Sequence, residues 1–151
     1  MKQTRFSFAK ESTEFGGAKK PGRKSMRPLS TKRGVHLILK SRRNLFEVSQ
    51  PLLEILIPMA LKNGIKIYDL AVAFDHVHLL MKFPSREAFR KFIRGVTGTL
   101  ARKFGANLWA QLPFTRLFTW QSDYWNLKRY MKQNREEALG NRPYKKRKRA
   151  G

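Results

Sequence analysis

The sequence predicts a single α+β domain in which helices pack against a β-sheet. The chain has 151 residues, a length that fits one domain with one core. Hydrophobic residues make up 41% of the chain and aromatic residues 12%, which is enough apolar material to fill such a core. Short stretches of branched apolar residues alternate with longer stretches whose apolar residues recur at helical spacing, and this alternation predicts both strands and helices.

The first half of the domain opens with a predicted strand at residues 35–40, which reads VHLILK and is short, branched and apolar. A helix is expected to follow it. Ser49 stands where an N-cap residue should be, and apolar residues then recur every three or four positions as far as Asn63 and Gly64, a pair that favours a helix end. Pro58 lies inside this helix and should kink it.

Two strands are predicted next, at residues 65–74 and 76–83. Only Asp75 and its neighbours separate them, so they should form a tight antiparallel hairpin. Ser85 can cap the helix that follows. Apolar residues then recur at helical spacing until Gly105, where this helix should end.

The last predicted elements are a strand at residues 114–120 and a helix from about residue 124 to about residue 139, capped by Ser122 and Asp123. The full order is strand, helix, strand, strand, helix, strand, helix. Its first six elements form the split arrangement of ferredoxin-like folds. We therefore expect a ferredoxin-like sheet with helices on one face, plus a C-terminal helix, and a second face open for a ligand, as in many nucleic-acid binders.

The net charge of +23 is spread over the whole chain. The first 34 residues carry ten Lys or Arg and two Glu, and residues 140–151 carry six Lys or Arg and no acid. This distribution predicts a basic tail at residues 1–33, a functional domain at 34–139 and a second basic tail at 140–151. A polyanionic partner follows, most often nucleic acid. A purely structural RNA-binding protein would carry the same charge.

The absence of cysteine excludes disulfides, cysteine zinc sites and cysteine nucleophiles. Any bound metal must therefore use His, Asn, Gln or carboxylate ligands. No apolar run is long enough to span a membrane, and the first residues lack the apolar segment of a secretory signal. We therefore expect a cytoplasmic protein without a membrane partner.

The strongest local feature is the pair of histidines His76 and His78 on the third predicted strand. Alternate side chains of a strand share a face, so the two rings point the same way from Cα atoms about 6–7 Å apart and can converge on one cation. The alternative is a merely polar strand face. A central strand gives such a pair no packing purpose, which favours the metal site. The third histidine, His36, is expected to be a packed strand residue.

The second feature is Tyr130, with Asn134 one turn later on the last helix. This spacing puts the two side chains on one helix face, with Cβ atoms about 6 Å apart. If the helix crosses the open face of the sheet, Asn134 could be a third metal ligand and Tyr130 could attack a phosphate. Gln133 is an alternative ligand, and an aromatic side chain packed on the sheet is the alternative interpretation of Tyr130.

Several segments, spread over roughly residues 17–139, resemble the HUH single-tyrosine transposases, in particular the REP-associated tyrosine transposases of bacteria. FDHVHLLMKF resembles the His-hydrophobic-His motif of that family, and LKRYMKQN resembles its tyrosine helix. GRKSMRP with HLILKSRRN resembles its basic lead-in and first strand, and FRKFIRGVTGTLARKFG resembles its second helix. Asp75 stands where the family often has Asn, a difference expected to alter the turn rather than the metal ligands.

The resemblance implies a role for each residue of the two motifs. His76, His78 and Asn134 would bind Mg²⁺ or Mn²⁺, and Tyr130 would be the nucleophile. The substrate would be single-stranded DNA carrying a hairpin, cut with formation of a 5′-phosphotyrosine link and release of a 3′-hydroxyl. A homodimer, with the tyrosine acting in trans, is also implied. The cations expected to contact DNA are Arg23, Lys24, Arg27, Arg42, Arg43, Arg90, Arg94, Lys128, Arg129 and Lys132.

Two other functions fit parts of the same pattern. A domesticated, non-catalytic nucleic-acid-binding protein would use the basic surface without cutting, but it would be expected to have lost one of the four site residues. Relaxases and rolling-circle initiators carry the same histidine pair, although they usually need a longer domain. The presence of all four groups favours an active single-tyrosine transposase.

Overall fold

The structure of the protein is a computed structural model that describes residues 13–18 and 26–144. Most of the two predicted basic tails, including Arg23 and Lys24, lies outside the described residues. Within the described residues, none of the helices is both long and apolar enough to cross a lipid bilayer.

A five-stranded antiparallel sheet organises the chain, with strand order β1-β5-β2-β4-β3. Without β1, this is the ferredoxin-like order, so the predicted α+β class and split arrangement are confirmed. The strands are β1 (Glu14–Gly17), β2 (Gly34–Lys40), β3 (Lys66–Val72), β4 (His76–Lys82) and β5 (Leu112–Phe118). The helices are the short 3₁₀ helix η1 (Phe46–Val48), α1 (Ser49–Lys62), α2 (Arg86–Phe104) and α3 (Ser122–Ala138).

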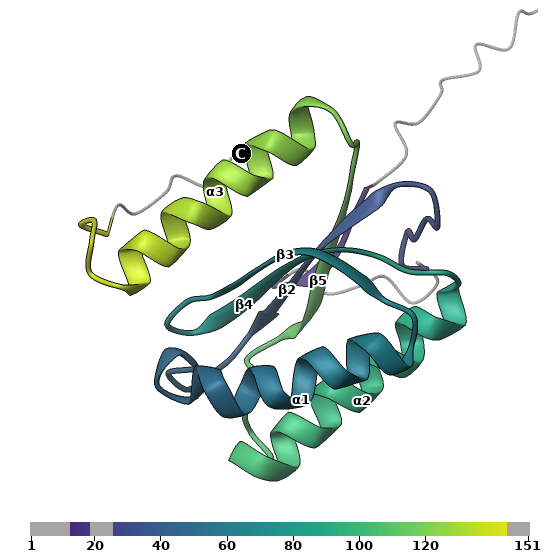
Figure 1. Ribbon diagram of the computed structural model, residues 1–151. Helices are drawn as coiled ribbons and strands as arrows, with labels where there is room; N and C mark the ends of the chain where they lie inside the picture. Colours follow the sequence, from purple (N-terminus) through teal and green to yellow (C-terminus); the bar gives the residue numbers. More distant parts are fainter. Residues whose placement is uncertain (1–12, 19–25, 145–151) are drawn as a thin grey trace, which may run out of the picture.

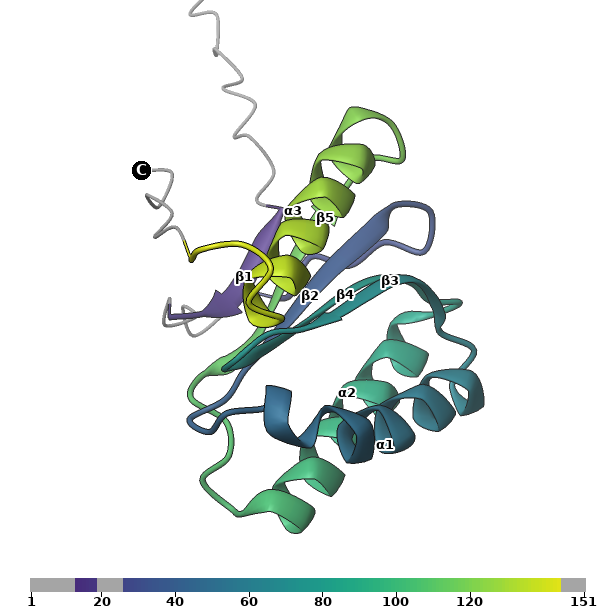
Figure 2. The same cartoon turned by 60° about the vertical axis from the view of Figure 1, so that its left-hand side comes forward.

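The molecule has three layers (Figure 1). Helices α1 and α2 cover one face of the sheet, and α3 crosses the other face, as the turned view also shows (Figure 2). The expectation of an open second face is therefore wrong. Met131 of α3 is fully buried with Leu80 and Phe118 of the sheet, because the apolar side of α3 is removed from water only by packing there.

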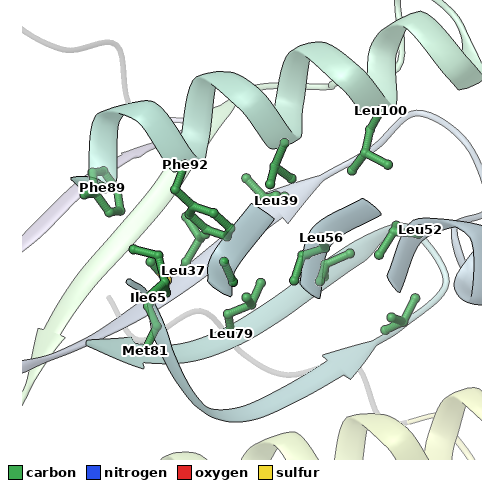
Figure 3. Packing of buried hydrophobic residues seen from close by; sticks show 14 of the residues in the cluster. Leu37, Leu39, Leu52, Leu56, Ile65, Leu79, Met81, Phe89, Phe92 and Leu100 are labelled. Carbon is green, nitrogen blue, oxygen red and sulfur yellow. The ribbon is translucent and has the colours of Figure 1, made fainter. Parts of the chain in front are cut away.

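The main core lies between the sheet and the α1–α2 layer (Figure 3). Strand alternation assigns the side chains of β4 to the two faces. Val77, Leu79 and Met81 enter this core, whereas Leu80 belongs to the smaller cluster under α3. His76 and His78 have the same parity as Leu80 and so also face α3.

The ends of the helices agree with the sequence in some places and not in others. Ser85 caps α2 by accepting a hydrogen bond from the Ala88 N–H at 3.1 Å, and Gly105 follows its last residue with a positive φ of 124°, as predicted. Ser49 is the first residue of α1 rather than its cap, because η1 leads directly into that helix. Helix α1 continues through Pro58.

The predicted cap of the last helix is also different. Helix α3 begins at Ser122, and Gln121 stands at the N-cap position without a side-chain cap. Asp123 accepts hydrogen bonds from the Thr119 N–H and Oγ1 at 3.2 and 3.0 Å. The Asp123 carboxylate therefore stabilises the turn between β5 and α3 and does not cap the helix.

Strand β1 is an element that the sequence did not predict, and it lies in the segment expected to be a tail. It pairs with β5 at the sheet edge. Arg27 holds the same edge, since its guanidinium donates to the Pro113 carbonyl at 2.8 Å and to Thr115 Oγ1 at 2.9 Å and lies 4.5 Å from the Phe15 ring centroid. Burial lowers the pKa of the Arg27 guanidinium from its ordinary value.

Candidate active site

His76 and His78 lie side by side beneath α3. Their ring centroids are 4.5 Å apart, and the rings are nearly perpendicular. His78 has no exposed surface, whereas His76 is partly exposed. An open second face of the sheet would have left both histidines exposed to solvent, and this expectation is wrong for His78 because α3 covers it.

Each ring has its Nδ1 atom engaged by a different neighbour. His76 Nδ1 is 2.6 Å from Oδ1 of Asp75, and His78 Nδ1 is 3.0 Å from Nε2 of His36. A metal-binding histidine usually has its second ring nitrogen held in this way, which fixes the orientation of the ring. Nε2 is then the nitrogen that each of the two rings can offer to a ligand.

His36 is buried on β2, diagonally across the β2–β4 ladder from His78. Burial lowers the pKa of His36 to about 4, and electrostatic interactions with Arg116 and His76 add to the effect. At neutral pH the His36 ring is therefore uncharged and carries a single proton. The sequence suggested only a packed strand histidine here.

Helix α3 brings Tyr130 to the histidines within one chain. The Tyr130 ring centroid is 5.6 Å from that of His78 and 6.4 Å from that of His36, and it is close to perpendicular to both. A polar contact fixes the helix on the sheet: Arg135 Nη1 donates to Asp69 Oδ1 at 2.8 Å and to the Leu70 carbonyl at 2.9 Å.

Asn134 and Gln133 have different surroundings. Asn134 is 4% exposed and lines the pocket that contains His76 and Tyr130. Gln133 donates to Glu137 Oε1 at 3.0 Å and lines a neighbouring pocket. Of the two predicted alternatives, Asn134 is therefore the amide that shares a pocket with His76.

The pocket between the sheet and α3 has a volume of about 690 Å³. Besides the residues expected from the sequence, it contains a cation, two carboxylates and a second tyrosine, which the sequence had not assigned to the site. Its lining residues are Lys40, Ala73, Phe74, Asp75, His76, Tyr130, Asn134, Glu137, Ala138 and Tyr144. Lys40 pairs directly with His76 across β2 and β4, a relation that depends on strand register and so is not visible in the sequence.

A second pocket, of about 450 Å³, also contains Tyr130. Three cations line it, Arg129, Lys132 and Arg142, of which Arg142 lies 3.3 Å from the Glu136 carboxylate in the same pocket. Two of these were predicted to contact DNA. Tyr130 therefore lies between a pocket that contains a histidine and a pocket rich in positive charge.

The other predicted DNA-contacting cations lie elsewhere. Lys128 is on α3, with its Nζ 5.6 Å from the Tyr124 ring centroid. Arg90 and Arg94 are exposed on α2, across the sheet from α3 (Figure 1). Arg42 donates to the carbonyl of Asn107, just after α2, and Arg43 donates to the carbonyl of Phe104, the last residue of α2. The structure thus does not gather all the predicted cations around Tyr130.

The metal ligands expected from the sequence are two imidazoles and one amide. Among the described residues, no three His, Cys, Asp or Glu side chains are grouped so that they could hold a metal ion. A cation held by both histidines would therefore take a third protein ligand of another residue type, and Asn134 is a buried amide that lines this pocket. Amide oxygen suits Mg²⁺ and Mn²⁺, whereas imidazole nitrogen suits softer divalent ions, so this mixed set admits several divalent ions. Because Nδ1 of each ring is already engaged, Nε2 is the nitrogen of each ring that could bind the ion, and the residues fit a divalent ion in this sense.

Comparison with known proteins gives a family and a related fold. A family described as "Transposase IS200 like" matches residues 31–137. The ISDra2 transposase TnpA of Deinococcus radiodurans is 30% identical over 80 residues, which are 53% of this chain and 54% of that protein. The chain thus matches about half the length of this relative.

A solved structure resembles this fold over most of the chain. It is described as a REP-associated tyrosine transposase bound to a REP hairpin, and it has a TM-score of 0.59 with 16% sequence identity. The similarity covers 80% of this chain and 79% of the other. At this level of identity, what the two proteins demonstrably share is the fold.

Proposed function

This chain belongs to the IS200-like transposase family, and from that membership we propose that it nicks and rejoins single-stranded DNA at hairpin-associated sites with Tyr130 as the nucleophile. One observation carries the proposal: the Tyr130 ring lies 5.6 Å from His78, beside His76 and Asn134, in a pocket within a single chain. This arrangement supports a tyrosine that acts in cis. The catalytic domain would be residues 34–139.

In the cleavage step, the Tyr130 phenolic oxygen attacks the scissile phosphorus. The new Tyr–O–P bond forms as the P–O3′ bond breaks, and the phenolic proton passes to solvent while the leaving 3′ oxygen takes up a proton. The products are a 5′-phosphotyrosine link and a free 3′-hydroxyl. Because a phosphodiester is exchanged for a phosphotyrosine ester, a later 3′-hydroxyl can reverse the step without another energy source.

His76, His78 and Asn134 would hold a divalent cation, Mg²⁺ or Mn²⁺. When bound, such an ion neutralises the charge that develops on the transferred phosphate. Asp75 and His36 hold the two imidazoles in orientation through their Nδ1 atoms. Burial beneath α3 keeps water from His78 and so strengthens the electrostatic interactions at that position.

The DNA strand would reach Tyr130 along α3. Arg129 and Lys132 line the second pocket that contains Tyr130, and their charges suit the phosphates that flank a cut site. A hairpin substrate is proposed because the solved structure with the shared fold is described as bound to a REP hairpin.

The test is a covalent-adduct experiment with single-stranded oligonucleotides that carry a hairpin and randomised flanks. A label at the 3′ end marks the fragment that would stay attached to the tyrosine. In Mn²⁺ the wild-type chain should give a labelled adduct that resists denaturation, and EDTA should abolish it.

A matched pair of variants identifies the nucleophile. Tyr130→Phe should abolish the adduct, whereas Tyr144→Phe, which alters another tyrosine of the same pocket, should leave it. Retention of the adduct in Tyr130→Phe would reject Tyr130 as the nucleophile. DNA binding by the wild type without an adduct on any hairpin would instead support a non-catalytic binding protein.

A further inference from the structure

We propose that His36 is a positioning residue that fixes the tautomer of His78 and thereby keeps His78 Nε2 available as a ligand atom. The proposal deepens the proposed function, since it concerns the residues expected to hold the divalent cation. It assigns a task to the third histidine of the chain, which the family motif does not include.

The geometry joins the two rings through one pair of atoms. His36 Nε2 and His78 Nδ1 are 3.0 Å apart, and both residues are buried. The rings are nearly parallel, with an interplanar angle of 19°. Their backbones are held by the central β2–β4 ladder, where His36 pairs with Leu80 and Ile38 pairs with His78, so the Cα positions of the two histidines are fixed relative to each other.

When both imidazoles are neutral, the hydrogen bond between them contains only one proton, and the position of this proton decides what His78 can do. If His78 Nδ1 donates, its Nε2 has a lone pair and can bind a cation. If His36 Nε2 donates instead, the His78 proton is on Nε2, and that atom cannot bind a cation. The first arrangement alone is compatible with a metal-binding His78.

The neighbouring histidine has the arrangement that we infer for His78. Asp75 Oδ1 lies 2.6 Å from His76 Nδ1, and a carboxylate can only accept, so the His76 proton is on Nδ1. His36 would do for His78 what Asp75 does for His76, with a neutral acceptor in place of a charged one. His36 is therefore not proposed as a metal ligand itself, because its Nε2 atom contacts Nδ1 of His78 and not the Nε2 atom that would bind the cation.

The first test uses the wild-type full chain without metal. Long-range ¹H–¹⁵N NMR correlations distinguish the two tautomers of a neutral histidine. The proposal expects the His78 proton on Nδ1. A His78 proton on Nε2 would overturn the proposal whatever the variants do.

The second test compares His36→Gln with His36→Phe. The glutamine carbonyl can still accept from His78 Nδ1, whereas the phenylalanine fills the buried space without an acceptor. His36→Phe should weaken Mn²⁺ binding, measured by isothermal titration calorimetry, by about 10- to 100-fold, and His36→Gln should recover most of that loss. Equal Mn²⁺ affinity in His36→Phe and the wild type would overturn the proposal.

The two proposals fail in different ways. A chain with the expected His78 tautomer and the expected Mn²⁺ affinities that forms no Tyr130 adduct supports the role of His36 and contradicts only the proposed function. If His36→Phe does not fold, as judged by far-UV circular dichroism, the proposal is still tested by two measurements. These are the tautomer of His78 in the wild type and the Mn²⁺ affinity of His36→Gln. A large loss of affinity in a folded His36→Gln would count against the proposal.

Discussion

At the scale of single residues, burial of His36 makes the stability of the fold depend on pH. The pKa of this ring falls from 6.5 to about 4 on folding, mainly because burial penalises the charged form. Below pH 6.5 the unfolded chain therefore binds a proton that the folded chain does not. Stability is complete above pH 6.5 and is lost as the pH falls toward 4.

We expect the metal-free protein to lose about 2 kcal/mol of unfolding free energy through His36 alone between pH 7 and pH 5. Urea denaturation in EDTA at several pH values measures this loss. His36→Gln, which has no titrating group at this position, is the control and should depend less on pH. The same pH dependence in both proteins would contradict the prediction.

Residue chemistry was predictable where the signal lies within one element. Spacing alone pairs His76 with His78 on a strand and Tyr130 with Asn134 on a helix, because each pair needs only the period of its own element. His36 and Lys40 could not be assigned in this way. Their relation to His78 and His76 depends on the register between β2 and β4, and no local pattern encodes that register.

At the scale of elements, two glycines should respond to the same substitution with opposite signs. A Cβ on Gly34 would lie 2.2 Å from Cζ of Phe118, whereas a Cβ on Gly98 in α2 would meet nothing closer than Arg102 Nη1 at 3.7 Å. Gly34→Ala should destabilise the protein by about 1–3 kcal/mol through overpacking. Gly98→Ala should stabilise it by about 0.5–1 kcal/mol.

Urea denaturation of the two glycine variants checks both values, and each variant serves as the control for the other. Equal stability of Gly34→Ala and the wild type would mean that Phe118 can leave its place over β2. It would also mean that Phe118 is not required for the packing of Leu80 and Met131 in the smaller cluster under α3.

Helix α3 should depend on Arg135 for its position. Arg135 bonds to Asp69 and to the Leu70 carbonyl of β3, and its loss leaves a largely buried carboxylate without its cation. In Arg135→Met we expect hydrogen exchange of α3 amides to accelerate about tenfold, which corresponds to about 1.4 kcal/mol.

Hydrogen–deuterium exchange with mass spectrometry measures this effect peptide by peptide. Arg129→Met is the matched control, because Arg129 is exposed on the same helix. Peptides from α2 should exchange as in the wild type in both variants. Unchanged α3 exchange in Arg135→Met would show that apolar packing alone fixes the helix.

At the scale of the whole molecule, the charge of +23 should not contribute evenly to DNA binding. Arg129 and Lys132 line the pocket beside Tyr130, whereas Arg90 and Arg94 are exposed on α2 across the sheet. If single-stranded DNA lies along α3, Arg129→Ala with Lys132→Ala should lower the slope of log K against log salt by about 1.4, since each phosphate contact contributes about 0.7.

Fluorescence anisotropy of a labelled hairpin oligonucleotide over a range of KCl concentrations measures the slope. The control double variant, Arg90→Ala with Arg94→Ala, removes the same charge and should leave the slope unchanged. A larger effect of this second pair would move the DNA path to the α2 side and away from the pocket that contains Tyr130.

The architecture was predictable from the sequence except where distant segments meet. The order of the elements and the split arrangement follow from periodicity inside each segment, and they are confirmed. The position of α3 on the second face was not predictable, because it depends on contacts of α3 with β3 and with the smaller cluster under α3, which join residues far apart in the sequence. Strand β1 was missed because it is four residues long, contains two glycines and gains its hydrogen bonds only from β5.

The contact of Arg135 with the Leu70 carbonyl also bears on how the protein behaves at high concentration. Strand β3 is one outer edge of the sheet, and an outer strand with a free row of backbone groups invites another chain to add to it. Here the Arg135 side chain donates a hydrogen bond to the Leu70 carbonyl. A register irregularity between Ile67 and Asp69 also interrupts the regular series of backbone groups along β3. The opposite edge is the short β1, which ends in two glycines with positive φ. Neither edge offers a long, flat template, so the fold itself protects this chain against aggregation by strand addition.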